Sequence, residues 1–325
     1  MFAKRRILKV GNAPSVKTPI LLPSFSSKGF PNIANILKAM EEYISDEILV
    51  SAYDLHFKEL ESGFDFASVI FLDSGGYEAS KESELSETFD REHLARPWVP
   101  EMYAEVISKW SALSPTIFVS FDHPKNRCGI FEQVERAKAL SLPPSGGHYA
   151  KSLLIKPETV DSKRVHLAKV VPAISKMTDF AVIGVTEKEI GNSMLDRMIN
   201  VARLRQELNR HHPDIPIHVF GSLDTISTYL YFLAGADIFD GLTWLRYAFS
   251  DGDTIYRHSF GTMNLPLNTN SDIVEGRCWT NNYQYMQQMR LNMMKYLSDG
   301  AFEHFGKHHA HIKNAFDTMK AAIGD

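Results

Sequence analysis

The chain has 325 residues, of which 44% are hydrophobic and 23% charged, and its net charge is −4. This balance is typical of a globular protein with ample material for a core. The negative net charge argues against a broad surface that coats nucleic acid, and leaves room only for a local basic patch.

Short apolar runs alternate with amphipathic stretches along the first 250 residues. The runs are rich in β-branched and aromatic residues and cover 18–25, 47–55, 68–75, 116–122, 152–157, 180–185, 217–222 and 237–244. Helical patterns lie at 31–44, 99–113, 131–140, 163–177, 194–211 and 224–235. Pro31 suits a first helical position, and Gly235 suits a helix end.

Continuous apolar runs are typical of strands buried on both faces of a parallel sheet. Eight such strands with crossover helices predict an α/β fold, a (β/α)8 TIM barrel over residues 1–250. An open doubly wound sheet is the alternative. Residues 251–325 are expected to form a C-terminal helical extension packed on the barrel.

Two segments outside the strands stand out. The connection at 78–97 is long and polar, and predicts either a mobile lid or a disordered loop. The helical tail carries His304, His308, His309 and His311. A metal site at the last three is conceivable, but no carboxylate or cysteine lies beside them at ligand spacing, so we expect no metal.

The two cysteines, Cys128 and Cys278, are too few for a disulfide framework or a cysteine-rich zinc site, and Cys278 is expected to be a small core residue. The N-terminus lacks the apolar run of a signal peptide, and no window approaches about 18 consecutive apolar residues. We therefore expect a cytoplasmic protein without a membrane span.

Polar residues and glycines fall where the predicted strands end. Barrel enzymes place their chemistry at the C-terminal ends of the strands. A single aspartate there could simply cap the next helix. Three aspartates that each end an apolar run predict instead a shared pocket. The strand-end residues are Asp73, Asp122, Lys156, Gly184, Phe220 and Asp240.

The stretch FLDSGGYE (71–78) adds two glycines and an aromatic ring to a strand-end acid. Gly75 and Gly76 allow a tight turn and a close approach of the backbone to a ligand. Tyr77 is either an exposed residue beside that turn or a flat ring on which a planar ligand stacks.

The stretch GADIFDGLTWLRYA (235–248) is the second dense region. Asp240, between Phe239 and Gly241, is costly to bury without partners, so it has either structural hydrogen bonds or a role in a pocket. Arg246 and Tyr247 follow on a loop, where they either contact a phosphate or stay solvated.

Four of these stretches carry motifs of a known family. FLDSGGYE is similar to a DSGGFQ motif, SFDHP (120–124) to an FDE-type motif, VIGVTEKEIG (182–191) to a glycine-bearing sixth strand, and GADIFDGLTWLR (235–246) to a GxDxFDxxxPTR segment. With weaker similarities at 17–25 and 48–55, the chain resembles the tRNA-guanine transglycosylases over about residues 5–250. It more closely resembles their DNA-directed relatives, the DpdA-type enzymes that place 7-deazaguanines in DNA. The first and fourth motifs are specific when taken together.

This resemblance implies exchange of a guanine for a 7-deazaguanine base, such as a preQ0-like base, without cutting the backbone. By match to the motifs, Asp240 would attack the sugar C1′ and form a covalent intermediate. Asp73 would be the general acid and base. Asp122 would read the N1 and exocyclic-amine edge of the purine.

The resemblance also assigns the remaining residues of the pocket. Tyr77 and Phe220 would sandwich the ring, backbone groups around Gly184 would meet the purine oxygen, and Ser74 would support the site. Lys156 lies at the position where the tRNA enzymes have a glutamine that donates to the purine oxygen. The lysine would donate the same hydrogen bond.

The chain departs from the tRNA enzymes at their zinc site of three cysteines and a histidine. Only Cys278 lies near that region, and Asn281 stands where another cysteine is expected, so we expect no zinc and no cofactor. Phe220 replaces a methionine, and Trp244 and Leu245 replace a proline and a threonine. These differences lie at positions for substrate recognition, whereas Asp73 and Asp240 match the family motifs.

The leading hypothesis is therefore a DNA-guanine transglycosylase whose partners are DNA, a 7-deazaguanine base and proteins of a DNA-modification system. The rival is a zinc-less tRNA enzyme of the queuine or archaeosine type. Two further hypotheses are a barrel that binds purines without exchanging them and an unrelated barrel hydrolase.

Overall fold

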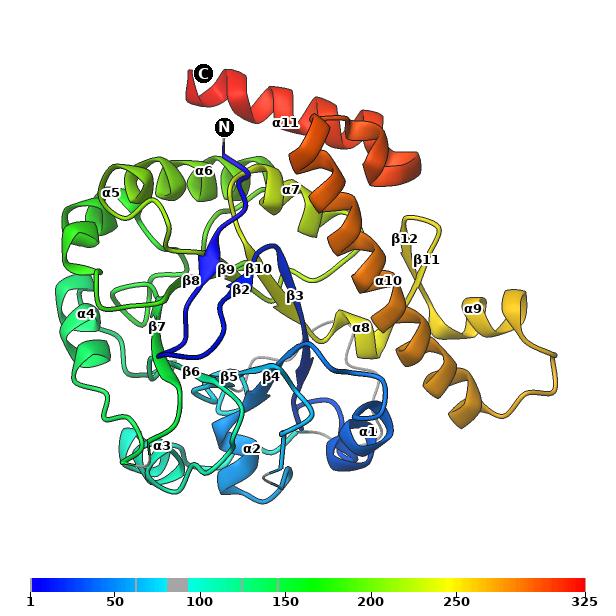
Figure 1. Ribbon diagram of the computed structural model, residues 1–325, viewed down its shortest axis with the longest axis horizontal. Helices are drawn as coiled ribbons and strands as arrows, with labels where there is room; N and C mark the ends of the chain where they lie inside the picture. The colour runs from blue at the N-terminus through cyan, green and yellow to red at the C-terminus, as the bar shows by residue number, and fades with distance from the viewer. Residues whose placement is uncertain (1, 62, 81–92, 124, 145, 325) are drawn as a thin grey trace.

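Eight parallel strands close into a barrel with helices around it (Figure 1). The computed structural model describes residues 2–61, 63–80, 93–123, 125–144 and 146–324. The strands are β3 (Ile20–Phe25), β4 (Glu47–Ser51), β5 (Val69–Asp73), β6 (Thr116–Val119), β7 (Tyr149–Ile155), β8 (Val182–Thr186), β9 (Ile217–Phe220) and β10 (Ile238–Gly241). Each predicted run overlaps one of them, although β7 begins three residues before its run and β8 ends one residue after its run. The predicted barrel is confirmed, and the open-sheet alternative is wrong.

Alternate residues of each strand face two different cores. In β5, Val69 and Phe71 belong to the cluster inside the barrel, whereas Ile70 and Leu72 pack outward under the helices. Both sets are buried, which explains why the run is continuously apolar. Since successive side chains alternate, Asp73 continues the inward set and points into the mouth of the barrel.

The outer layer is helical. It contains α1 (Ile33–Met40), α2 (Ala52–His56), α3 (Pro100–Ser108), α4 (Ile130–Lys138), α5 (Leu167–Val170) with the 3₁₀ segment η1 (Val171–Lys176), α6 (Met194–His211), α7 (Ser227–Leu233) and α8 (Thr243–Arg246).

Two helix expectations are corrected. Asn32 is the N-cap residue of α1, so Pro31 lies outside the helix. The stretch 163–177 changes from α-helix to 3₁₀-helix at Val171, because Pro172 cannot donate the next backbone hydrogen bond.

A buried charge cluster lies where the first and last barrel strands meet. β10 pairs with β3, and Ile238 lies opposite Ile20. Just before β10, Asp237 accepts from Arg6 at 2.8 Å and from Arg205 at 2.6 Å, and all three side chains are buried. This cluster ties the N-terminal segment to α6 at the end of the barrel opposite the mouth. The hairpin of β1 (Ile7–Leu8) and β2 (Val16–Lys17) covers that end, with Leu8 in the inner cluster.

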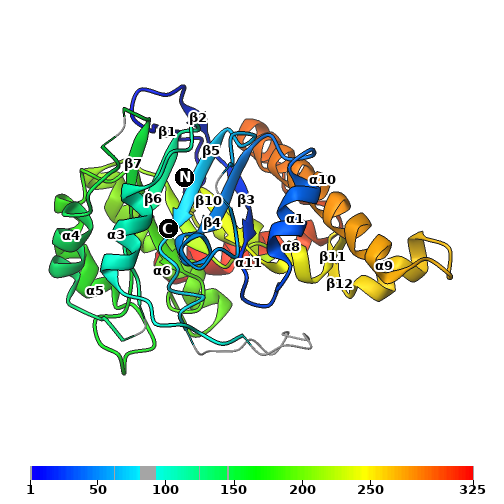
Figure 2. The same ribbon diagram turned by 90° about the horizontal axis from the view of Figure 1, so that it is seen from below.

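The C-terminal part consists of the hairpin β11 (Ala248–Ser250) and β12 (Asp253–Ile255), then α9 (Arg257–Asn264), α10 (Ser271–Asp299), η2 (Phe302–His308) and α11 (His309–Ile323). α11 packs on α6 and α7, and α10 contacts α8, β11 and β3. Figures 1 and 2 show α9 and the first turns of α10 standing away from the barrel. The expected boundary at 250 falls in the turn of the β11–β12 hairpin. Among the described helices, none has the length and apolar character needed to cross a membrane.

Candidate active site

A cavity of about 260 Å³ opens at the C-terminal ends of the strands. Most of the predicted site residues lie in its wall: Asp73, Ser74, Gly76, Tyr77, Asp122, Lys156, Phe220, Asp240 and Arg246. Gly75, Gly184 and Tyr247 are not among the described residues that line it. The segment 81–92, which holds most of the predicted lid or loop, lies outside the described residues.

Asp240 is held by hydrogen bonds with three groups. Its Oδ1 is 2.9 Å from His218 Nε2 and accepts from the backbone N–H of Gly221 at 3.2 Å. Its Oδ2 accepts from the Ser24 hydroxyl at 2.9 Å. The side chain is almost fully buried. A buried carboxyl group with this many hydrogen bonds has a fixed orientation, which is what a nucleophile requires.

Asp73 has a poorer set of partners. Its Oδ2 accepts one hydrogen bond, from the backbone N–H of Gly75 at 3.1 Å. Burial, followed by the negative charge of Glu78, raises the pKa of Asp73 to about 7, and Asp240 and Asp122 add to the rise. At neutral pH this carboxyl is therefore divided between its protonated and ionised forms, as a general acid and base should be.

The turn after β5 explains both glycines, by different causes. Gly75 has φ +87°, and a Cβ there would lie 2.6 Å from Tyr53 Cβ. The φ of Gly76 is not in the left-handed region. A Cβ added to Gly76 would instead lie 2.8 Å from both the backbone oxygen and the Oδ2 of Asp122. Ser74 is buried, and its hydroxyl accepts from the backbone N–H of Asp122 at 3.0 Å. The turn thus packs against the loop that carries Asp122, and both glycines are needed for protein contacts.

Asp122 belongs to a network of paired charges. Arg127 donates to its Oδ1 at 2.5 Å, and Lys156 Nζ lies 3.2 Å from its Oδ2. The ammonium of Lys156 also lies 2.6 Å from Glu189 and donates to Thr186 at 3.1 Å. Burial lowers the pKa of Lys156, but Asp122 and Glu189 outweigh it, so its pKa is raised. The ammonium of Lys156 thus lies near three protein oxygens, and its donation to a purine oxygen stays a prediction.

Gly184 makes room for the ring of Phe220. A Cβ on Gly184 would lie 2.6 Å from Phe220 Cε2, because the two residues occupy neighbouring strands on the inward face. The ring of Phe220 stacks on that of His218 with centroids 3.7 Å apart. Phe220 can therefore offer one face to the cavity while the other rests on His218.

Tyr77 and Arg246 also lie in the cavity wall and contact each other. Arg246 donates to the hydroxyl of Tyr77 at 3.0 Å, and Lys28 Nζ lies 4.4 Å from the centroid of the tyrosine ring. A base that stacks on Tyr77 has to use the ring face opposite Lys28. Tyr247 lies next to Tyr256, with ring centroids 6.0 Å apart.

Glu78 is buried beneath this turn. It accepts from the hydroxyl of Ser26 and, at 2.9 Å, from the hydroxyl of Ser51. Asp54 is also buried and accepts from the backbone N–H of Ser27 at 2.8 Å. Burial and the charge of Glu78 raise the pKa of Asp54 well above its usual range. Several carboxyls are therefore gathered on the β4–β5 side of the barrel mouth.

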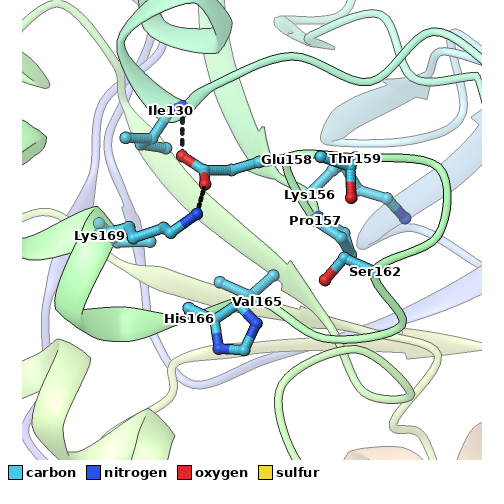
Figure 3. A pocket seen from close by; sticks show the side chains of 10 residues that line it. Ile130, Lys156, Pro157, Glu158, Thr159, Ser162, Val165, His166 and Lys169 are labelled. Carbon is cyan, nitrogen blue, oxygen red and sulfur yellow. Dashed lines mark hydrogen bonds and ion pairs between the residues drawn. The ribbon is translucent and has the colours of Figure 1, made fainter.

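A second cavity, of about 160 Å³, shares Lys156 with the first, and Figure 3 shows the side chains that line it. Glu158 in that wall pairs with Lys169 and accepts from the backbone N–H of Ile130 at 3.2 Å. Its charged groups are satisfied within the protein, so the candidate chemistry lies in the first cavity.

Two of the C-terminal histidines form hydrogen bonds with aspartates. His308 Nε2 lies 2.7 Å from Asp253, and His304 Nε2 lies 2.7 Å from Asp299. Asp253 in β12 thus supplies a carboxylate beside His308 that the sequence spacing did not indicate. Within the described ranges, no group of three or more histidine, cysteine or acidic side chains is placed to hold a metal.

Cys278 is buried against Ala248 and Phe260, and burial raises its thiol pKa to about 11.

Sequence reasoning missed His218, Ser24, Arg127 and Glu189. The signal for His218 was present, because residues two apart on a strand share a face and Phe220 was already expected to face the cavity. Ser24 could have been found from barrel closure, which places it two residues beyond Leu22, the partner of Asp240. Arg127 and Glu189 lie on loops, where no strand period applies.

Comparisons of the chain with models of protein families and with curated proteins found no match. The assignment of a function to this cavity therefore rests on its residues and their geometry.

Proposed function

We propose that the protein exchanges a guanine in DNA for a 7-deazaguanine through a covalent bond between Asp240 and the sugar. The observation that carries this proposal is that two aspartates face one cavity in different surroundings. Asp240 has hydrogen bonds with three groups, whereas Asp73 has one such bond and a pKa raised to about 7. A pair of carboxyls in such different settings is typical of a nucleophile and a general acid.

In the first half of the reaction, a carboxylate oxygen of Asp240 uses an electron pair to form a bond with C1′. The C1′–N9 bond breaks, and its electron pair goes to the purine, which takes a proton from the carboxyl of Asp73. Guanine leaves, and the sugar remains attached to Asp240 as a glycosyl ester.

The second half reverses these roles. The ionised Asp73 takes the N9 proton of the incoming 7-deazaguanine, whose N9 then attacks C1′. The bond to Asp240 breaks, and its electron pair returns to the carboxylate. The cycle is balanced without an added cofactor, and the phosphodiester backbone is untouched.

The rest of the cavity supports binding of a purine. The aromatic rings of Tyr77 and Phe220 both line this cavity. Stacking of a base on an aromatic side chain contributes about 1–3 kcal/mol. Asp122 supplies acceptor oxygens for the N1–H and exocyclic amine. The same two oxygens also lie beside Arg127 and Lys156, which fix the orientation of the carboxyl group.

A base inside a duplex cannot reach such a cavity, so the substrate has to be single-stranded or the base has to be extruded from the stack. Arg246 at the rim suits contact with a phosphate of the flanking backbone.

The test is incorporation of labelled guanine into duplex DNA, single-stranded DNA and tRNA in parallel assays. Incorporation into DNA is expected. Incorporation only into tRNA would overturn the DNA assignment in favour of a zinc-less tRNA enzyme. Binding of 7-deazaguanine without incorporation into any of the three would instead indicate a purine-binding barrel.

Replacement of the nucleophile tests the covalent step. Asp240→Asn should lower exchange by about 10⁴-fold or more and abolish the adduct on a denaturing gel. Asp251→Asn is the matched control, because Asp251 lies on the exposed β11–β12 turn with φ 45°, a conformation that asparagine tolerates. Near-normal turnover by the Asp240 variant would refute the proposed nucleophile.

A further inference from the structure

His218 lies directly beside the proposed nucleophile. It is fully buried in β9, and β10 places Ile238 opposite it, two residues before Asp240 on the same inward face. Its Nε2 is 2.9 Å from Asp240 Oδ1. This contact depends on two neighbouring barrel strands, so the relative position of the two side chains is fixed by the sheet.

The surroundings of the imidazole determine which nitrogen carries the hydrogen. The ring lies between Phe220, with centroids 3.7 Å apart, and the edge of Phe71, at 5.7 Å. Its Nδ1 is buried and has no hydrogen-bond partner among the residues that the structure describes. An ionised carboxylate only accepts, so Nε2 has to be the protonated nitrogen. A second hydrogen on Nδ1 would bury a charged ring with an unpartnered N–H, which is costly.

We propose that His218 is a positioning residue that acts as the neutral Nε2–H tautomer and aims Oδ2 of Asp240 at the substrate. Oδ1 accepts from both His218 and Gly221, whereas Oδ2 accepts only from the Ser24 hydroxyl among the described residues. Oδ2 therefore keeps the less engaged electron pair. The inference rests on the proposed function, since it assigns the attacking oxygen of the base exchange.

The role of His218 is constant through the reaction. Oδ2 forms the bond to C1′, and Oδ1 becomes the carbonyl oxygen of the glycosyl ester. A carbonyl oxygen still accepts a hydrogen bond, so the Nε2–H of His218 stays in place and no proton passes to or from the ring. The proton of the leaving purine is supplied by Asp73.

The test uses three substitutions that differ in the reach of the donor. The amide of His218→Gln extends about as far as Nε2, that of His218→Asn extends only about as far as Nδ1, and His218→Leu has no donor. Single-turnover adduct formation on labelled single-stranded DNA and tRNA gives the rate, and titration with 7-deazaguanine gives the dissociation constant for the base.

The glutamine variant should form the adduct within about tenfold of the wild-type rate. The asparagine and leucine variants should lose about 100-fold, the usual effect of a nucleophile misplaced by about 1 Å. Affinity for the base should change less than about threefold in all of them. The inference is wrong if glutamine is no better than leucine, or if leucine reacts at the wild-type rate. If the leucine variant does not fold, the rates of adduct formation by the glutamine and asparagine variants are compared, and equal rates would show that the inference is wrong.

A second measurement does not depend on catalysis. The ¹⁵N shifts of the His218 ring in the wild-type protein should show a protonated Nε2 and a bare Nδ1, and the opposite tautomer would overturn the inference. A wild-type protein with the expected tautomer and no base exchange in any nucleic acid would count against the proposed function, while the positioning contact itself would stand.

Discussion

Asp73 and Asp240 carry the same carboxyl group on the inward face of two barrel strands, and their neighbours make them different. Asp240 is surrounded by donors from β3, β9 and the loop after β9. Asp73 instead lies near other acids, of which Glu78 has the largest effect on it after burial. The different roles proposed for the two aspartates thus follow from the residues around them.

The pH dependence of guanine release should follow Asp73. Release needs the protonated carboxyl, whose pKa is raised to about 7, so the single-turnover rate should fall about tenfold per pH unit above that value. Glu78→Gln removes a negative charge, which makes proton loss from Asp73 easier and moves the fall to lower pH. The control is Glu101→Gln on the exposed side of α3. A pH profile that is unchanged in the Glu78 variant would contradict this.

Substitution of the two glycines of the turn should have different effects, one on stability and one on binding of the base. Gly75→Ala combines a positive φ with a contact to Tyr53, and should lower the free energy of unfolding by roughly 2–4 kcal/mol. Gly76→Ala should displace Asp122 and weaken binding of 7-deazaguanine, with a smaller loss of stability. Urea unfolding and calorimetric titration separate the two. Equal losses of stability with intact base affinity would show that both glycines serve only the turn.

At the scale of elements, α10 contacts the segment that follows β10 through the buried side chain of Asn282. Asn282 accepts from the backbone N–H of Phe249 at 2.7 Å and donates to the carbonyl oxygens of Trp244 and Tyr247, at 2.6 and 2.7 Å. Arg246 lies between these anchored residues. The C-terminal extension therefore holds the end of α8, which carries Arg246 where the sequence predicted a loop, and the loop that follows it.

Asn282→Leu should leave three backbone groups without this partner, two of them in buried and one in a partly buried hydrogen bond. The expected loss in the free energy of unfolding is about 3 kcal/mol or more, because each unsatisfied group costs about 1–3 kcal/mol. Asn281→Ala is the control, since Asn281 donates to the single carbonyl oxygen of Phe249 and should cost about 1 kcal/mol. Urea denaturation measures both. Losses of the same size would mean that Asn282 does not anchor the loop.

The strands are the part of the fold that the sequence predicts best, because both of their faces are buried and the apolar runs are continuous. The inward positions of Asp73, Phe220 and Asp240 follow from the two-residue period of the same runs. Asp122 lies beyond the last residue of β6, so its place depends on the Ser74 hydroxyl and on Arg127. Contacts between loops of different strands have no period along the chain, and the sequence alone did not predict them.

For the molecule as a whole, the buried cluster of Arg6, Asp237 and Arg205 should be a point at which the loss of one partner is strongly destabilising. Asp237→Ala leaves two buried guanidinium groups without their carboxylate, and should lower the free energy of unfolding by about 3–5 kcal/mol. Replacing all three residues by apolar ones of similar volume should recover much of that loss. Urea unfolding of both variants is the measurement, and a stable Asp237→Ala protein would show that the cluster contributes little.

The closure of the barrel between β3 and β10 has a consequence for synthesis. β3 is among the first strands to leave the ribosome, and β10 is the last strand of the barrel to follow it. At roughly 5–20 residues per second, β3 waits on the order of tens of seconds with one backbone edge unpaired. An unpaired edge is a template for pairing with another chain. The nascent protein is thus most prone to aggregation before Asp237 and β10 emerge, and their arrival ends that period by closing the ring.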